Sequence, residues 1–123
     1  MDTVLIVDDH SDTAESLEML LKLEGFETRT YTHYEPALEE VSHNGSCLVF
    51  ADLKVPGKLT VDEFVRRARQ SRPTIKIVVA SGCSDIAQRA AQMAADDYLL
   101  KPYDPNRVLD IVSRFCRRPE TAV

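Results

Sequence analysis

The chain has 123 residues, a length that fits one domain with a core of its own. Apolar residues make up 44% and charged residues 28% of the chain, and no apolar run reaches the ~18 residues that a membrane-spanning helix needs. The net charge of −5 argues against direct nucleic-acid binding, and an acidic N-terminus without a basic leader argues against a secretion signal.

Along the first half of the chain, apolar runs of strand length alternate with stripes of helical spacing. In chain order we expect a strand over Val4–Val7, a helix around Leu17–Leu21, a weaker strand over Thr28–Tyr31 and a helix over Tyr34–Val41. Asp12 and Glu15 have the spacing of a capping box for the first helix, and Gly25 is placed to end it. The second helix should end near Asn44–Gly45.

The second half of the chain repeats the alternation three times. In order, we expect a strand over Leu48–Ala51, a helix over Val61–Ala68, a strand over Ile75–Ala80, a helix from about Asp85 to Met93, a strand over Tyr98–Leu100 and a helix over Val108–Phe115. Pro73 stops the third helix, and Asp104-Pro105 supplies the N-cap and first residue of the last one. The fourth helix is rich in alanine, so we expect it to pack lightly.

Five β–α units with short connections predict a parallel sheet covered by helices on both faces. We expect a single domain over residues 1–123, with its core at about residues 4–116 and a tail or the start of a linker at 117–123. The three cysteines, Cys47, Cys83 and Cys116, are far apart and odd in number. They fit neither a metal site nor a disulfide framework, so we expect reduced thiols in a cytoplasmic protein.

Polar residues follow four of the five expected strands: Asp8 and Asp9, then Asp52, then Ser81, then Lys101. In an open parallel sheet these positions share the edge where ligands bind. Crowded carboxylates should raise at least one carboxyl pKa unless a hard cation such as Mg²⁺ binds there. A metal ion, a lysine and a hydroxyl can together neutralise phosphoryl oxygens, and a carboxylate can be the nucleophile. Each of these residues alone would indicate only a helix cap or a turn. Their joint placement at the strand ends is what indicates a phosphoryl-transfer site.

Four segments, VLIVDDH, LVFADLKVPG, IVVASG and DDYLLKPY, resemble the receiver (phosphoacceptor) domain of bacterial two-component response regulators. The resemblance covers about Val4 to Phe115. It implies a flavodoxin-like, doubly wound (βα)5 sandwich with strand order 2-1-3-4-5. It also implies a signalling module that takes a phosphoryl group from a sensor histidine kinase or a histidine phosphotransfer protein. Such a module catalyses only its own phosphorylation and slow autodephosphorylation.

By this resemblance Asp52 is the phosphoacceptor and Lys101 contacts the phosphoryl group. Asp9 would bind Mg²⁺ directly, Asp8 would act mostly through water, and Asp52 with the backbone carbonyl of Lys54 would complete the protein ligands. Mn²⁺ can substitute for Mg²⁺ in this expectation.

The resemblance also implies a conformational switch. Ser81 would be the hydroxyl that moves to the phosphoryl group, and Tyr98 the aromatic residue that turns inward behind it. Lys101-Pro102 matches a bond that is typically cis in the family. The fourth helix, fifth strand and fifth helix would form the face for an output domain, a downstream protein or a phosphorylation-dependent homodimer. No contact with nucleic acid or membrane is expected of this domain.

Some positions depart from the family pattern. Thr60 stands where glycine is common, Tyr103 stands where phenylalanine is usual, and the segment from Ser81 to Lys101 is slightly short. We hypothesise that the Lys54 side chain shields or attracts at the mouth of the site and sets the lifetime of the phosphorylated state; the alternative is an ordinary surface lysine. We expect Cys83 to be a small filler residue, not a redox sensor, because no activating base is near it in sequence.

Four other functions share part of this pattern. A phosphatase of the haloacid dehalogenase type would place a second Asp two residues after the first, where Lys54 stands. A flavodoxin-like FMN carrier would need a Ser/Thr/Gly-rich loop after the first strand in place of DDHSDT, and a dinucleotide site would need G-x-G-x-x-G. A receiver that works without phosphorylation would more often have lost one of the acids or the lysine.

Overall fold

The computed structural model describes residues 3–43 and 45–116, in which strands and helices alternate. The strands are β1 (Thr3–Val7), β2 (Glu27–Tyr31), β3 (Ser46–Asp52), β4 (Lys76–Ser81) and β5 (Asp97–Leu100). The helices are α1 (Ser11–Leu23), α2 (Tyr34–His43), α3 (Val61–Ser71), α4 (Ile86–Gln92) and α5 (Pro105–Phe115). The expected elements are therefore all present. The expected end of α2 at Asn44 and the expected tail at 117–123 lie outside the described residues.

The five strands form one parallel sheet in the order β2-β1-β3-β4-β5, as the resemblance implied. β1 and β3 lie side by side in its middle, with Val7 opposite Ala51. Asp52 at the end of β3 is opposite Ala80, and Ser81 is opposite Leu100. The sheet thus aligns the carboxyl ends of its strands at one edge.

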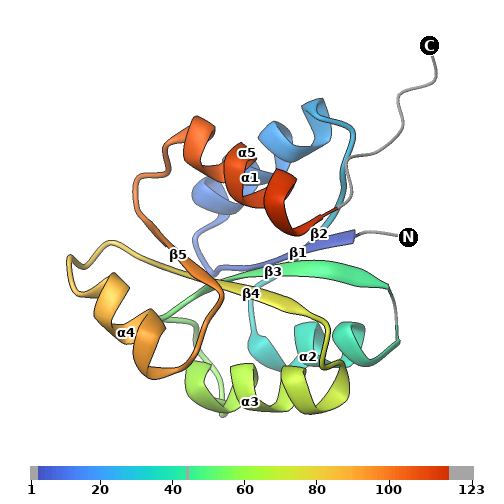
Figure 1. The fold of residues 1–123 in the computed structure, drawn as a ribbon, viewed down its shortest axis with the longest axis vertical. Helices are drawn as coiled ribbons and strands as arrows, with labels where there is room; N and C mark the ends of the chain where they lie inside the picture. Colours follow the sequence, from blue (N-terminus) through green and yellow to red (C-terminus); the bar gives the residue numbers. More distant parts are fainter. Residues whose placement is uncertain (1–2, 44, 117–123) are drawn as a thin grey trace.

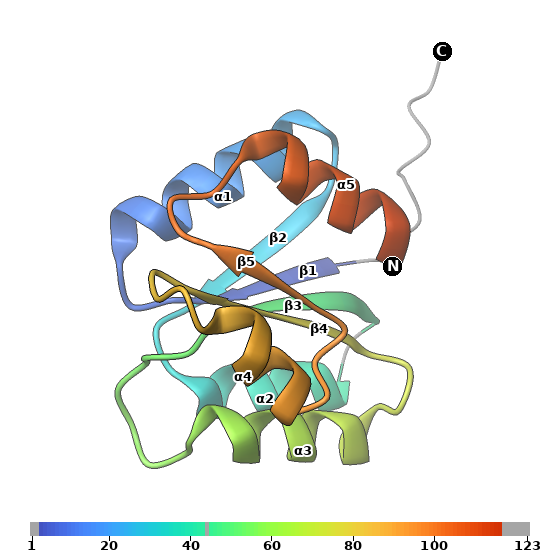
Figure 2. The same cartoon turned by 60° about the vertical axis from the view of Figure 1, so that its left-hand side comes forward.

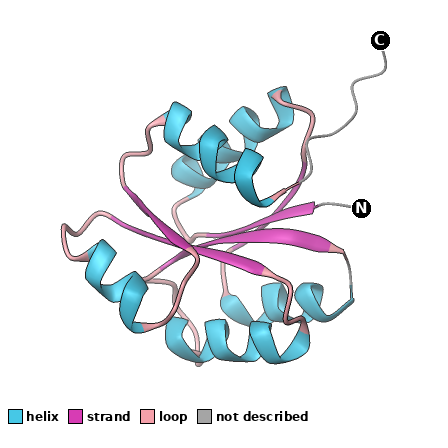
Figure 3. Cartoon of the chain, in the orientation of Figure 1, coloured by secondary structure: helices cyan, strands magenta, loops and turns pink. Residues whose placement is uncertain are grey.

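Helices cover both faces of the sheet, with α1 and α5 on one side and α2, α3 and α4 on the other (Figures 1 and 2). Colouring by secondary structure makes the three layers plain (Figure 3). Val4 and Ile6 pack in the core under α1 and α5, whereas Leu5 and Val7 pack in the core under the other helices. Because both faces are covered, successive strand residues are buried, which explains the continuous apolar runs in the sequence.

Three of the predicted helix boundaries are confirmed, the first being the end of α3 at Ser71, before Pro73. The Asp104 side chain accepts a hydrogen bond from the Asn106 backbone N–H, and Gly25 follows α1 with a positive φ of 87°. The capping box is wrong: α1 begins at Ser11, so Asp12 already lies inside its first turn. Thr60, the departure from glycine, caps α3 by accepting a hydrogen bond from the backbone N–H of Glu63.

The expectation of reduced thiols at Cys47 and Cys116 is wrong, because the two form a disulfide. The residues are separated by 69 positions in the chain, yet their Cα atoms lie 5.5 Å apart. The fold brings the start of β3 beside the end of α5, a proximity that no local spacing reveals. Cys83 remains a free, exposed thiol.

α4, with seven residues, is the shortest helix in the described ranges and buries only Ile86 and Ala90. This agrees with the expected light packing of an alanine-rich helix. Among the described residues, no helix is long and apolar enough to cross a membrane.

Candidate functional site

The edge formed by the carboxyl ends of the strands gathers the predicted site residues. Asp8 and Asp9 directly follow β1, Asp52 is the last residue of β3, and Ser81 is the last residue of β4. Lys101 directly follows β5. Because the strands are parallel, residues far apart in sequence come together here without any long loop.

Lys101 joins the two buried carboxylates of this edge. Its Nζ lies 2.9 Å from Asp8 Oδ2 and 3.2 Å from Asp52 Oδ2. Asp8 and Asp52 are only 4% and 5% exposed, so both charges depend on partners inside the protein. The two carboxylates therefore hold the Lys101 ammonium at the sheet edge, where its positive charge can bind an anionic ligand. The Lys101–Pro102 bond is cis, as expected.

The two buried carboxyl groups have opposite pKa shifts. Burial raises the pKa of Asp8, but hydrogen bonds from Lys101 and His10 outweigh it and hold that pKa below its ordinary value of 3.8. Burial raises the pKa of Asp52 above 3.8, and the negative charge of Asp8 adds to this against the opposing charge of Lys101. The expected raised carboxyl pKa is thus confirmed at Asp52. Desolvation lowers the pKa of Lys101, but its bonds to the two acids outweigh it, so the pKa lies above 10.5 and the ammonium stays charged.

The donor atoms at this edge fit a hard divalent cation. Asp8, Asp9 and Asp52, together with His10, offer ligand atoms that all lie within 4.8 Å of one another. Mg²⁺ prefers oxygen ligands, and the three carboxylates supply them from the ends of two adjacent strands, β1 and β3. The Lys54 backbone N–H donates a hydrogen bond of 3.4 Å to Asp52 Oδ1, whereas the Lys54 carbonyl as a metal ligand stays a prediction.

His10 was missed in the sequence, although it directly follows the acidic pair. Its Nδ1 lies 3.2 Å from a carboxylate oxygen of Asp8 and 3.2 Å from one of Asp9. The signal was present in VDDH, since the residues of the short loop after a site strand lie at that strand's edge of the sheet.

Ser81 and Tyr98 lie in different surroundings. Ser81 is buried, and its Oγ accepts a hydrogen bond of 3.0 Å from the Cys83 backbone N–H. Tyr98 is 37% exposed, and the guanidinium carbon of Arg107 lies 5.7 Å from the centre of its ring. Tyr98 therefore faces outward toward α5, so the inward turn remains a prediction.

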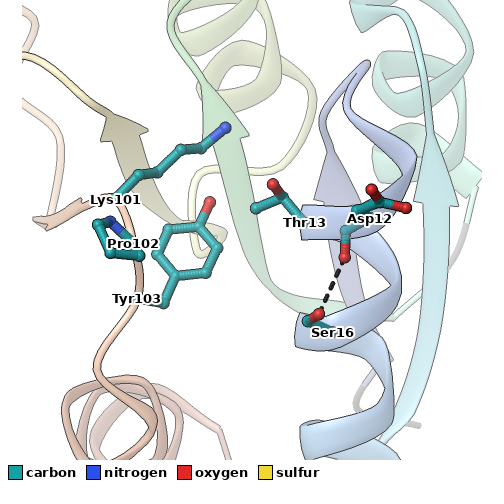
Figure 4. Close-up of a pocket in the computed structure, with 6 residues that line it drawn as sticks. All are labelled: Asp12, Thr13, Ser16, Lys101, Pro102 and Tyr103. Atoms are coloured by element: carbon teal, nitrogen blue, oxygen red, sulfur yellow. Dashed lines mark hydrogen bonds between the residues drawn. The ribbon is translucent and has the colours of Figure 1, made fainter.

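Two surface hollows are lined by predicted site residues, one by Lys101 and the other by Lys54. One of about 520 Å³ lies between the start of α1 and the loop before α5; Figure 4 shows Lys101, Pro102 and Tyr103 on one side and Asp12, Thr13 and Ser16 on the other. Burial, followed by the charges of Asp8 and Asp52, raises the pKa of Tyr103, so its phenol is neutral. The second, of about 440 Å³, is lined by the exposed Lys54 together with Tyr34, Asp62 and Arg89.

Tyr34 was expected only as a core residue of α2. Its hydroxyl in fact donates a hydrogen bond to the backbone carbonyl of Asp52. Burial, then the charge of Asp52, raises the pKa of Tyr34, so the phenol stays protonated and remains a donor. Nothing in the local sequence predicts this contact, which depends on how α2 packs against the end of β3.

Comparison with known proteins agrees with this arrangement. A family model described as the response regulator receiver domain matches residues 4–113. The chain belongs to this family. It is a receiver domain of two-component response regulators, a signalling module and not a classical enzyme.

Similar receiver-containing proteins include RegX3 of Mycobacterium tuberculosis, a sensory transduction protein, with 34% identity over 96% of this chain and 52% of that protein. The DNA-binding response regulator MtrA of Mycolicibacterium smegmatis is 33% identical over 95% of this chain and 51% of that protein. The chain therefore spans about half the length of these curated relatives.

Solved structures share the fold. A putative response regulator from Chloroflexus aurantiacus has a TM-score of 0.82 and 30% identity, covering 93% of this chain and 96% of that one. TrrA from Thermotoga maritima, solved in complex with Mg²⁺-BeF, has a TM-score of 0.83 and 27% identity, covering 94% of this chain and all of that one.

Proposed function

We propose that Asp52 accepts a phosphoryl group from a phosphohistidine of a sensor histidine kinase or a histidine phosphotransfer protein, in a reaction that depends on Mg²⁺. The observation that carries this proposal is the Lys101 ammonium held between Asp8 and Asp52 at the sheet edge. TrrA, a response regulator protein, was solved in complex with Mg²⁺-BeF, which supports the use of a metal in the proposed reaction.

In the proposed reaction, a carboxylate oxygen of Asp52 attacks the phosphorus atom. The new O–P bond forms as the P–N bond of the donor breaks, and the donor imidazole keeps the electron pair. Lys101 neutralises charge on the phosphoryl oxygens, because its ammonium is already fixed beside Asp52 before the donor arrives. Asp8, Asp9, Asp52 and the Lys54 carbonyl would hold the Mg²⁺ ion, which supplies further positive charge for those oxygens. Water later hydrolyses the acyl phosphate, and this slow autodephosphorylation ends the signal.

Phosphorylation is proposed to shift a two-state equilibrium in which Ser81 approaches the phosphoryl group and Tyr98 turns inward. The exposed apolar residues of β5, Tyr98 and Leu100, support an output face over α4, β5 and α5. A downstream region, a partner protein or a second copy of the phosphorylated chain would bind there. The hollow beside Lys101 is the proposed approach for the phosphohistidine donor, because Lys101 lines it.

The proposed domain boundaries rest on the extent of the two hydrophobic core clusters. We treat residues 1–123 as a single receiver domain with its core at about 4–116, since both core clusters start from β1 and one extends to α4 and the other to α5. RegX3 and MtrA are about twice as long as this chain, so the output that this domain controls in its own protein belongs to the proposal as well.

The deciding experiment is incubation of the protein with Mg²⁺ and acetyl phosphate, followed by intact-mass measurement. The parent should gain one phosphoryl group, and Asp52→Asn should gain none. Asp110→Asn, an exposed carboxylate on α5, is the matched control and should be modified like the parent. No mass increase in the parent would overturn the proposed function.

A further inference from the structure

Tyr34, the first residue of α2, has a hydroxyl that packing alone does not explain. Its ring is 1% exposed and stacks on Phe64 with 5.1 Å between the ring centres. A phenylalanine would fill the same space. A buried hydroxyl costs free energy unless it finds a hydrogen-bond partner, so the role of this phenol depends on the group it contacts.

The partner of that hydroxyl is the backbone carbonyl of Asp52. The residues that follow Asp52 are held from two other directions. The Leu53 N–H donates to the Ala80 carbonyl at 3.0 Å, and the Lys54 N–H lies 3.4 Å from Asp52 Oδ1. Tyr34 is therefore the side-chain contact that fixes the same peptide from the helical layer, on the side opposite to β4.

The next residue of α2 holds the far part of the same loop. One carboxylate oxygen of Glu35 accepts hydrogen bonds of 3.2 Å from the backbone N–H groups of both Lys58 and Leu59. Gly57 lies so close that a Cβ atom there would come within 3.1 Å of Glu35 Oε1. The first turn of α2 thus contacts the β3–α3 loop at its start through Tyr34 and near its end through Glu35.

We infer that Tyr34 is a positioning residue for phosphoryl transfer. It fixes the peptide between Asp52 and Leu53, and so holds the acceptor carboxylate and the Lys54 carbonyl in the positions that the proposed metal ion requires. The inference rests on the proposed function and deepens it. A rotation of the Asp52–Leu53 peptide would displace both the Asp52 carboxylate and the Lys54 carbonyl. Metal ligands depend on hydrogen bonds from neighbouring groups that hold them in place, and the Tyr34 hydroxyl supplies such a bond here.

The test compares Tyr34→Phe, which keeps the buried ring, with Tyr31→Phe. Tyr31 is the matched control because its hydroxyl also donates to another residue, Glu40 Oε1 at 3.0 Å, away from Asp52. For each protein, calorimetry gives the Mg²⁺ dissociation constant, hydrogen exchange gives the protection of the Leu53 and Lys54 amides, and acetyl phosphate gives the phosphorylation rate.

Tyr34→Phe should weaken Mg²⁺ binding by roughly 3- to 10-fold, the range for loss of one hydrogen bond, and should speed amide exchange at Leu53 and Lys54. Phosphorylation should then require correspondingly more Mg²⁺, while Tyr31→Phe should match the parent in all three measurements. Unchanged Mg²⁺ affinity and unchanged amide exchange in Tyr34→Phe would overturn the inference, even if that variant were less stable. A parent that binds Mg²⁺ but takes up no phosphoryl group would instead overturn the proposed function.

Discussion

At the scale of single residues, Lys54 is where this chain can differ from its relatives in the lifetime of the phosphorylated state. Lys54 stands two residues after Asp52, the proposed phosphoacceptor. Its side chain is exposed and lines the hollow that Tyr34 and Arg89 also line. A cationic side chain over this opening can shield the acyl phosphate from water.

We therefore expect Lys54→Ala to dephosphorylate faster, by about threefold or more, which corresponds to about 0.6 kcal/mol of activation free energy. Loss of the phosphoryl group would be followed by mass spectrometry after removal of the phosphodonor. Lys58→Ala, on the same loop, should keep the parent rate. Equal rates in Lys54→Ala and the parent would leave Lys54 an ordinary surface lysine.

At the scale of elements, β5 and α5 are joined by a charged cluster centred on Asp97. The Asp97 carboxylate accepts hydrogen bonds from Arg114 and, at 2.7 Å, from Arg107. Arg107 also lies over the Tyr98 ring and donates to the Tyr98 carbonyl at 3.3 Å. The cluster thus connects Tyr98, the proposed switch aromatic of β5, to the helix at the proposed output face.

The pKa of Asp97 predicts how this connection responds to pH. Burial raises the pKa of Asp97, but the Tyr98 N–H and the two arginines outweigh it and hold the pKa below its ordinary value of 3.8. The ionised carboxylate therefore stabilises the fold above pH 3.8, and this contribution is lost as the pH falls through the lower folded-state pKa.

We expect Asp97→Asn to reduce the free energy of unfolding by about 1 kcal/mol at pH 7, because the arginines are partly exposed and solvent screens them. The deficit relative to the parent should shrink as the pH falls below about 3.8. Urea unfolding at a series of pH values measures both effects, with Asp110→Asn on the same helix as control. A deficit that stays constant with pH would contradict the assigned charge pairing.

The sequence predicted those features that depend on local pattern. Val4–Val7 and Ile75–Ala80 read as buried strands because both faces of the sheet are covered, and parallel strands place Asp8, Asp52 and Lys101 at one edge without further information. What it could not predict depends on which side chains meet after packing. The Tyr34 hydroxyl reaches Asp52 through the packing of α2, and the pairing of Cys47 with Cys116 arises only when α5 docks beside β3.

At the scale of the whole molecule, the Cys47–Cys116 disulfide constrains most of the chain between β3 and the end of α5. A crosslink stabilises a protein largely by reducing the conformational entropy of its unfolded state, and the effect grows with the length of the closed loop. For a sequence separation of 69, the chain-entropy relation gives about 4 kcal/mol at 25 °C.

Reduction should therefore lower the urea midpoint of unfolding by about 2 M, given a slope of about 2 kcal/mol per molar for a domain of this size. Cys47→Ser should unfold like the reduced parent and be insensitive to reductant, whereas Cys83→Ser should keep the full response because Cys83 is a free thiol. The measurement is urea unfolding with and without a thiol reductant, with free thiols counted before each series. A parent that shows three free thiols before reduction would mean that the two cysteines are not paired, whereas equal midpoints for a verified disulfide and its reduced form would show that the crosslink leaves the global stability unchanged.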